Sequence, residues 1–132
     1  MGSAPIKIAV LDMYDGAPNM GMRCIRNIIN EWSNLRGHKI ELNIYDTRGN
    51  CKIPDNSYDI YLSTGGPGSP VDSKDEPWDT LYTEWLDQMF KLEKPVFLIC
   101  HSFQIACRHF DLGKVCFRTV SINTSSKAPI RQ

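Results

Sequence analysis

Residues 94–104 read KPVFLICHSFQ, the pattern of a strand that turns directly into a helix. A short apolar run opened by Pro95 is typical of a strand in a covered parallel sheet. After Cys100 the apolar residues return at helical spacing, and Gly113 is expected to close that helix. The sequence therefore predicts a strand-turn-helix unit with a thiol at the turn.

The turn is a chemically favourable place for Cys100. It lies at the carboxyl end of the predicted sheet, where open α/β folds place their ligands. It also lies beside a helix N-terminus, whose partial positive charge favours thiolate over thiol. We therefore take Cys100 as a candidate nucleophile. The other four cysteines have no metal-ligand spacing and are expected to be inert; they are Cys24, Cys51, Cys107 and Cys116.

Strand and helix patterns alternate along the rest of the chain. Strands are expected at residues 6–12, 40–44 and 58–63, with helices at 22–35 and 77–90 and a further strand at 115–122. The residues expected on one apolar face of the first helix are Met22, Ile25, Ile28, Ile29, Trp32 and Leu35. The alternation predicts a single α/β domain over residues 1–132 with a doubly wound, mostly parallel sheet.

Composition excludes several classes of protein. The 132 residues include 15 basic and 15 acidic side chains, so the net charge is zero and nothing suggests a nucleic-acid or membrane-surface partner. No apolar run is long enough to span a bilayer. Five cysteines without a pairing pattern favour a reducing compartment. We expect a soluble cytoplasmic protein that binds neither nucleic acid nor membrane.

A glycine-rich loop supplies the second chemical feature. Residues 64–70 read TGGPGSP and follow the third expected strand. Consecutive glycines let the backbone approach a substrate and direct N–H groups toward it, although an ordinary tight turn has the same composition. The loop is not a P-loop, because no Gly-Lys-Ser/Thr follows, and it is not a dinucleotide fingerprint, which belongs to the first strand-helix turn.

Two segments together resemble a known family. DIYLSTGGPGS at residues 59–69, followed by PVFLICHSFQ at residues 95–104, is similar to the class I glutamine amidotransferases, the triad-type glutaminase domains of enzymes such as GMP synthase. The family has a Gly-Gly-Pro turn and then a Cys-x-Gly-x-Gln elbow, and here Ser102 replaces the elbow glycine. The resemblance covers residues 6–113 and implies a flavodoxin-like fold.

The resemblance also implies roles for particular residues. Cys100 would attack the side-chain amide of glutamine, and the backbone N–H groups of Gly66 and His101 would form the oxyanion hole. Gly65 and Gln104 would help to hold the glutamine. No cofactor or metal is expected, and the ammonia would pass to a synthase domain or subunit.

One part of the family pattern is missing. Members complete a Cys-His-Glu triad with a His-x-Glu segment several tens of residues after the nucleophile. This chain has only His38, His101 and His109, none followed by x-Glu, and 32 residues follow Cys100. We therefore expect a domain without its C-terminal part, with impaired turnover and with exposed apolar surface that favours homo-oligomers. The family pattern does not extend into the tail at 119–132.

Two alternatives remain open at this point. The Cys100-His101 pair is similar to the DJ-1/PfpI group, in which a neighbouring His and a carboxylate from an early loop surround the reactive Cys. Asp12 or Asp15, at the end of the first strand, would supply that carboxylate. The other alternative is a non-catalytic amidotransferase-like domain that binds a partner.

Overall fold

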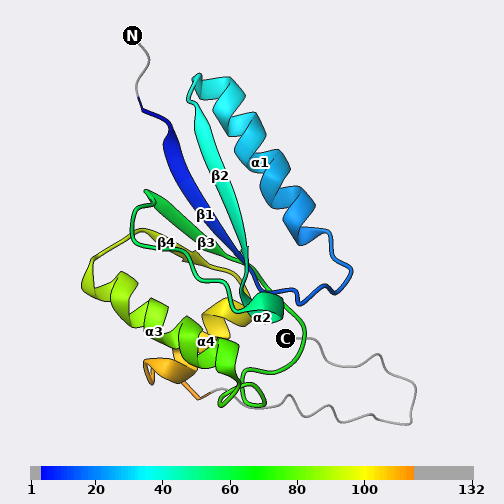
Figure 1. Cartoon of the computed structure of the whole chain (residues 1–132). Coiled ribbons are helices and arrows are strands. Elements are labelled where there is room, and N and C mark those ends of the chain that lie inside the picture. Colours follow the sequence, from blue (N-terminus) through cyan, green and yellow to red (C-terminus); the bar gives the residue numbers. More distant parts are fainter. Residues whose placement is uncertain (1–3, 115–132) are drawn as a thin grey trace.

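The computed structural model describes residues 4–114 and contains a four-stranded parallel sheet (Figure 1). The strands are β1 (Ile6–Asp12), β2 (Ile40–Asp46), β3 (Ile60–Ser63) and β4 (Val96–Leu98), in the spatial order β2-β1-β3-β4. Ile6 pairs with Ile40, and Tyr61 pairs with Val96. All pairs are parallel, so the four carboxyl ends lie at one edge of the sheet.

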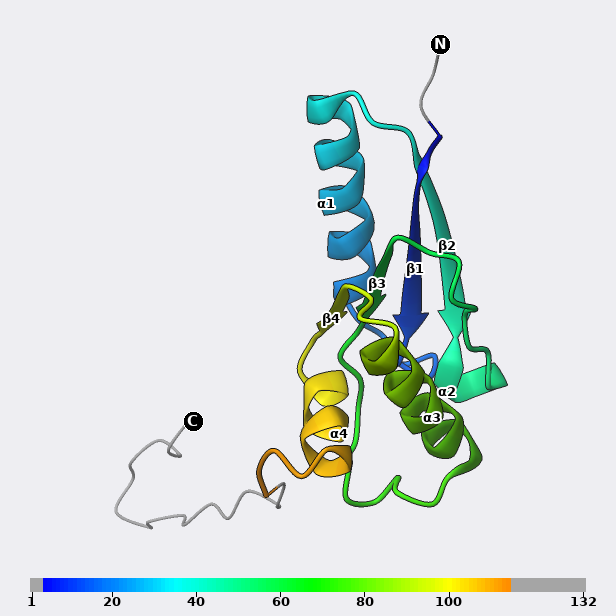
Figure 2. The ribbon, with the colours of Figure 1, turned by 90° about the vertical axis from the view of Figure 1, so that its left-hand side faces the viewer.

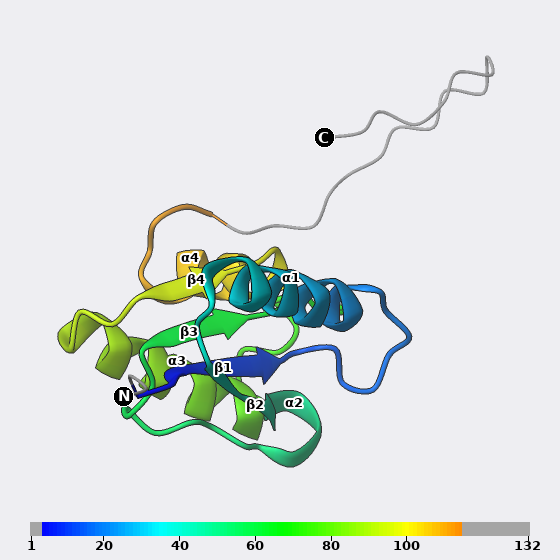
Figure 3. The same ribbon diagram turned by 90° about the horizontal axis from the view of Figure 1, so that it is seen from above.

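Helices cover both faces of this sheet. They are α1 (Gly21–Arg36), α2 (Thr47–Asn50), α3 (Pro77–Lys91) and α4 (His101–His109). Seen from above, α1 lies on one side of the strands and α3 on the other (Figure 3). The architecture is the doubly wound, flavodoxin-like arrangement that the alternating pattern predicts.

The two faces have separate apolar cores. The larger core joins the sheet to α3 and α4 and includes Leu11, Tyr61, Trp85, Leu86 and Ile105, all at most 2% exposed. The buried aromatics of α3, which are Trp78, Tyr82 and Trp85, are therefore core residues. The smaller core joins the sheet to α1 through Ile8, Val10 and Ile25. The larger core fixes α4, and hence the turn at Cys100, against the sheet.

The prediction for the apolar face of α1 is wrong in part. Ile25 is buried, and Met22 and Ile29 pack against the smaller core, but Ile28 is 65% exposed and Leu35 is 84% exposed. The helix contacts the sheet along a narrower stripe than the sequence pattern indicates, because a lone helix over a sheet edge buries only its inward face.

The expectation that β4 is covered is also wrong. Among residues 4–114, β4 is an edge strand and Phe97 is 61% exposed. Val96 and Leu98 point the other way and pack against the larger core. Figure 2, which views the sheet from the side, shows β4 beyond the region that α1 covers.

Of two glycines that come after helices, one closes its helix and the other does not. Gly37 closes α1, with a φ of 68° and its N–H donated to the Ser33 carbonyl. Gly113 does not close α4, which ends at His109 with Phe110 as its C-cap. The left-handed residue there is Asp111, with a φ of 55°. The expected strand at 115–122, the tail and Cys116 lie outside the described residues.

Two further elements differ from expectation. β3 begins at Ile60, two residues later than predicted. The one-turn helix α2 was not predicted; its N-cap is Asp46, whose carboxylate accepts the Gly49 N–H at 2.8 Å. No helix among residues 4–114 has the length and apolar character needed to cross a membrane.

Candidate functional site

Cys100 lies between β4 and α4 in an uncommon backbone conformation. Its φ is 49° and its ψ is −103°, a combination that costs a non-glycine residue on the order of 1–3 kcal/mol. The flanking hydrogen bonds hold it: Ile99 N–H donates to the Ser63 carbonyl at 3.0 Å, and Gln104 N–H donates to the Cys100 carbonyl at 3.0 Å. A strained turn of this kind lifts the thiol above the strand end, and Cys100 is exposed.

The glycine loop lies directly beside this turn. Gly65 is buried, and a Cβ placed on it would be 3.5 Å from the Cys100 Cβ. A Cβ on Gly66 would overlap the Met13 carbonyl oxygen, so no larger residue fits there without a backbone shift. A glycine is thus required at position 66 because the Met13 backbone comes close to it, and not because of a positive φ. Among the loop glycines, Gly68 has a positive φ, at 87°.

The two N–H groups expected in an oxyanion hole are available as donors. Gly66 N–H donates to no backbone carbonyl within residues 4–114. His101 N–H belongs to the first turn of α4, where a helix offers no acceptor of its own. Among residues 4–114, both N–H groups therefore lack a backbone acceptor. Gln104 lies one turn further along α4 with an exposed side chain.

The His101 side chain does not point toward Cys100. It is 1% exposed, its ring lies 6.4 Å from the Trp78 ring, and neither ring nitrogen has a hydrogen-bond partner within the described part of the chain. Burial, followed by the positive charge of Arg48, lowers the pKa of the His101 imidazole. The ring is therefore neutral at physiological pH and makes no hydrogen bond to the thiol.

Ser102, the residue that departs from the family pattern, joins the elbow to the glycine loop. Its hydroxyl donates to the Thr64 carbonyl at 2.5 Å and lies 2.7 Å from the Ser63 hydroxyl. Tyr82 of α3 donates to the same Ser63 hydroxyl at 2.7 Å. All four residues are buried. The sequence showed Ser102 as a substitution but gave no sign of these partners, which lie on other elements.

Sequence reasoning missed Tyr14 and Arg48. The Tyr14 hydroxyl reaches Gly65 from the loop after β1, since a Cβ on Gly65 would lie 3.9 Å from it. Arg48 Nη1 donates to the Pro67 carbonyl at 2.7 Å and to the Met13 carbonyl at 3.2 Å, and its guanidinium lies 4.8 Å from the Trp78 ring centre. It thereby ties the glycine loop to the end of β1. No local pattern marks either residue.

A cavity of about 350 Å³ opens beside the glycine loop. It is lined by polar side chains together with Trp78, and includes Asp15, Arg48, Ser69 and Glu76. Cys100 is not part of its lining. Cys100 is thus exposed outside this cavity, and Arg48, which also contacts the glycine loop, is part of the cavity lining.

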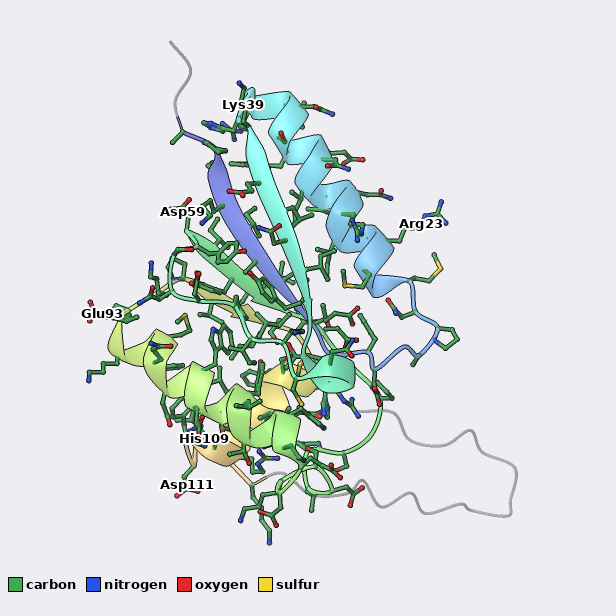
Figure 4. All side chains as sticks on the ribbon, viewed as in Figure 1. Arg23, Lys39, Asp59, Glu93, His109 and Asp111 are labelled. Carbon is green, nitrogen blue, oxygen red and sulfur yellow. The ribbon has the colours of Figure 1, made fainter. Side chains whose placement is uncertain are left out.

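The remaining histidines lie away from the thiol. His109 Nε2 lies 2.8 Å from an Asp87 carboxylate oxygen on the outer surface of α3 and α4 (Figure 4). His38 stacks on Trp32 after the end of α1. Asp12 accepts the Tyr14 N–H, and Asp15 lines the cavity. Residues 4–114 contain no cluster of three or more side chains that would hold a metal ion.

Comparison with known proteins adds evidence for the fold. No protein-family model matches the chain, and no curated protein matches it. The chain is similar to the protein in the crystal structure of SMU.1228c, with a TM-score of 0.55 and 22% sequence identity. The match covers 80% of this chain and 43% of that one, so this chain spans less than half of its structural neighbour. At this level of identity the likeness supports the α/β fold alone.

Proposed function

We propose that this chain is the nucleophile-bearing part of a class I glutamine amidotransferase, which hydrolyses the side-chain amide of glutamine. The observation that carries this proposal is the strained turn at Cys100 beside a glycine loop that admits no side chain at Gly66. An exposed thiol at a helix N-terminus suits acyl transfer, as do N–H groups at Gly66 and His101 that donate to no backbone carbonyl among residues 4–114.

The reaction follows from this arrangement. The Cys100 thiolate attacks the amide carbon, a C–S bond forms, and the carbonyl electron pair moves onto oxygen, which faces the N–H groups of Gly66 and His101. The C–N bond then breaks, and the nitrogen leaves as ammonia after accepting a proton. Water adds to the glutamyl thioester, and the C–S bond breaks to release glutamate and restore the thiolate.

The proton donor for ammonia is not among the described histidines. The His101 ring is buried and has no hydrogen-bond partner among residues 4–114, and His109 pairs with Asp87. In this proposal a His-Glu pair outside residues 4–114, from a partner or from the rest of a complete domain, supplies the general acid and base. The ammonia would pass to a synthase domain or subunit. The four cysteines among residues 4–114 are free thiols, which suits our placement of this chemistry in the cytoplasm.

Covalent trapping tests the proposal without requiring turnover. The purified chain is treated with a diazoketone analogue of glutamine, and the adduct is located by peptide mass spectrometry. We expect labelling at Cys100, no labelling there in Cys100→Ala, and only slow ammonia release from glutamine. The same diazoketone on the shorter asparagine side chain serves as the control. Equal labelling of Cys24, Cys51 and Cys100 by both reagents would contradict the proposal.

The same experiment addresses the alternatives. The DJ-1-like arrangement needs a histidine and a carboxylate around the thiol, whereas the structure buries the His101 ring against Trp78 and has Asp12 accept a backbone N–H. A non-catalytic binding domain would give no selective adduct with the glutamine analogue.

A further inference from the structure

Tyr14 is held in a fixed turn at the carboxyl end of β1. Its N–H donates to an Asp12 carboxylate oxygen at 2.9 Å, and its carbonyl accepts the Ala17 N–H at 2.9 Å. The turn therefore sets the direction of the Tyr14 side chain before α1 begins.

The Tyr14 hydroxyl lies against two glycines, and one of them, Gly21, makes room for it. A Cβ on Gly21, the first residue of α1, would overlap that hydroxyl. On the other side, a Cβ on Gly65 would lie 3.9 Å from the hydroxyl oxygen and 3.5 Å from the Cys100 Cβ. The space above Gly65, which a single methyl group would occupy, is thus bordered by both the Tyr14 hydroxyl and Cys100.

The hydroxyl is free to donate into this space. Within residues 4–114 the structure gives it no hydrogen-bond partner, although the Tyr14 backbone is fully paired. Burial, followed by the negative charges of Asp12 and of an ionised Cys100, raises the pKa of the Tyr14 phenol. Tyr14 therefore keeps its proton at neutral pH and offers an O–H donor beside the thiol.

We propose that Tyr14 determines specificity at this site, because its hydroxyl donates a hydrogen bond to the carboxamide of a substrate held at Cys100. This inference rests on the proposed function, and it adds a side-chain donor to the two backbone donors of the glycine loop and α4. In the reaction proposed above, the oxygen of the substrate's side-chain carboxamide accepts from Tyr14 while its carbon faces the thiolate.

Two small alkylating reagents separate this role from a general effect on the thiol. Iodoacetamide carries a carboxamide, whereas allyl iodide has similar size and no hydrogen-bond acceptor. With either, the Cys100 thiolate forms a C–S bond and iodide leaves. The ratio of the two rate constants at Cys100 cancels changes in thiolate fraction and in exposure. The same ratio at Cys51, an exposed thiol on another loop, is the internal reference.

The preference of Cys100 for iodoacetamide is its ratio of the two rate constants divided by the same ratio at Cys51. We expect this preference to fall about tenfold in Tyr14→Phe, because one hydrogen bond is lost. Gly21→Ala, whose methyl group displaces the hydroxyl, should do the same, so the test does not depend on one variant. Tyr45→Phe removes a hydroxyl that contacts Tyr58 instead and should leave the preference unchanged. Circular dichroism verifies that each variant is folded.

The outcomes distinguish this inference from the proposed function. An unchanged preference in both Tyr14→Phe and Gly21→Ala, or equal slowing by both reagents, would overturn the role of Tyr14 while leaving Cys100 as the nucleophile. A wild-type Cys100 that reacts no faster than Cys51 with either reagent would overturn the proposed function itself.

Discussion

At the scale of single residues, the site depends on positions where a side chain would not fit or would be strained. Cys100 adopts a φ of 49°, and its neighbours Ile99 and Gln104 hold the turn through backbone hydrogen bonds. Gly65 and Gly66 differ in what surrounds them, although the sequence presents them as an equivalent pair. That difference yields a matched test.

Gly66→Ala should destabilise the protein, because the added methyl group overlaps the Met13 carbonyl oxygen and the backbone must shift. We expect a loss of about 1–3 kcal/mol in the free energy of unfolding, measured by urea denaturation. Gly65→Ala places its methyl group at 3.5 Å from the Cys100 Cβ, an ordinary contact, so it should unfold near the wild-type midpoint while losing diazoketone labelling. Equal stability of the two variants would contradict this assignment.

How far the site could be predicted from sequence also differs between residues. Cys100 and the glycine loop could be located because strand, turn and helix signals are local. Tyr14 and Arg48 could not, because they reach the candidate site only by contacting Gly65 and Pro67 across the sheet edge. The sequence records only that each is a common residue type in a loop or short helix.

At the scale of elements, a buried hydroxyl cluster connects β3, α3 and α4. Ser63, Tyr82 and Ser102 share hydrogen bonds of 2.7 Å, and Ser102 also donates to the Thr64 carbonyl. This cluster fixes α4 relative to the glycine loop more directly than apolar packing does, because hydrogen bonds are directional.

Ser102→Ala should lower the free energy of unfolding by about 1–3 kcal/mol, because buried partners lose a hydrogen bond. Thr80→Ala on α3 is the control, since the Thr80 hydroxyl is exposed and its bond to the Glu76 carbonyl is long, at 3.4 Å. Urea denaturation should show a clear shift of the midpoint for the first variant and almost none for the second. A midpoint unchanged by Ser102→Ala would show that the cluster does not stabilise the elbow.

Tyr82 makes the same cluster sensitive to alkaline pH. Burial raises the pKa of Tyr82 from 10.0 to about 12. The folded state therefore holds this proton more tightly than the unfolded state, and the resulting stability is present below pH 10 and is lost as the pH rises toward 12. In Tyr82→Phe, the free energy of unfolding should fall less steeply over this range than in the wild type. Parallel curves would exclude the linkage.

Element boundaries were predictable where a local residue sets them. Gly37 ends α1 and Pro77 begins α3, as expected from cap chemistry. α2 has only four residues and no apolar period, so its Asp46 cap could not be recognised in advance. The end of α4 was misplaced because Asp111, not Gly113, adopts the left-handed conformation after the helix.

At the scale of the whole molecule, the sheet is covered unevenly. Phe97 pairs in register with Leu62 and so points to the same face, where α1 covers the β1–β2 side. Ile99, two residues on, is 42% exposed, and Phe103 of α4 is 56% exposed. Within the described part of the chain, the outer edge of β4 is also unpaired. Apolar side chains beside an open edge are a common origin of association between copies.

We therefore expect the purified chain to self-associate through this edge. Sedimentation velocity should show species larger than the monomer that grow with protein concentration, and Phe97→Lys should shift the distribution toward monomer, because a charge on that face resists burial. Met20→Lys is the control, since Met20 is 67% exposed in the loop before α1, away from β4. If the wild-type chain is monomeric at every concentration, or if both variants dissociate it equally, the apolar face at Phe97 is not the contact.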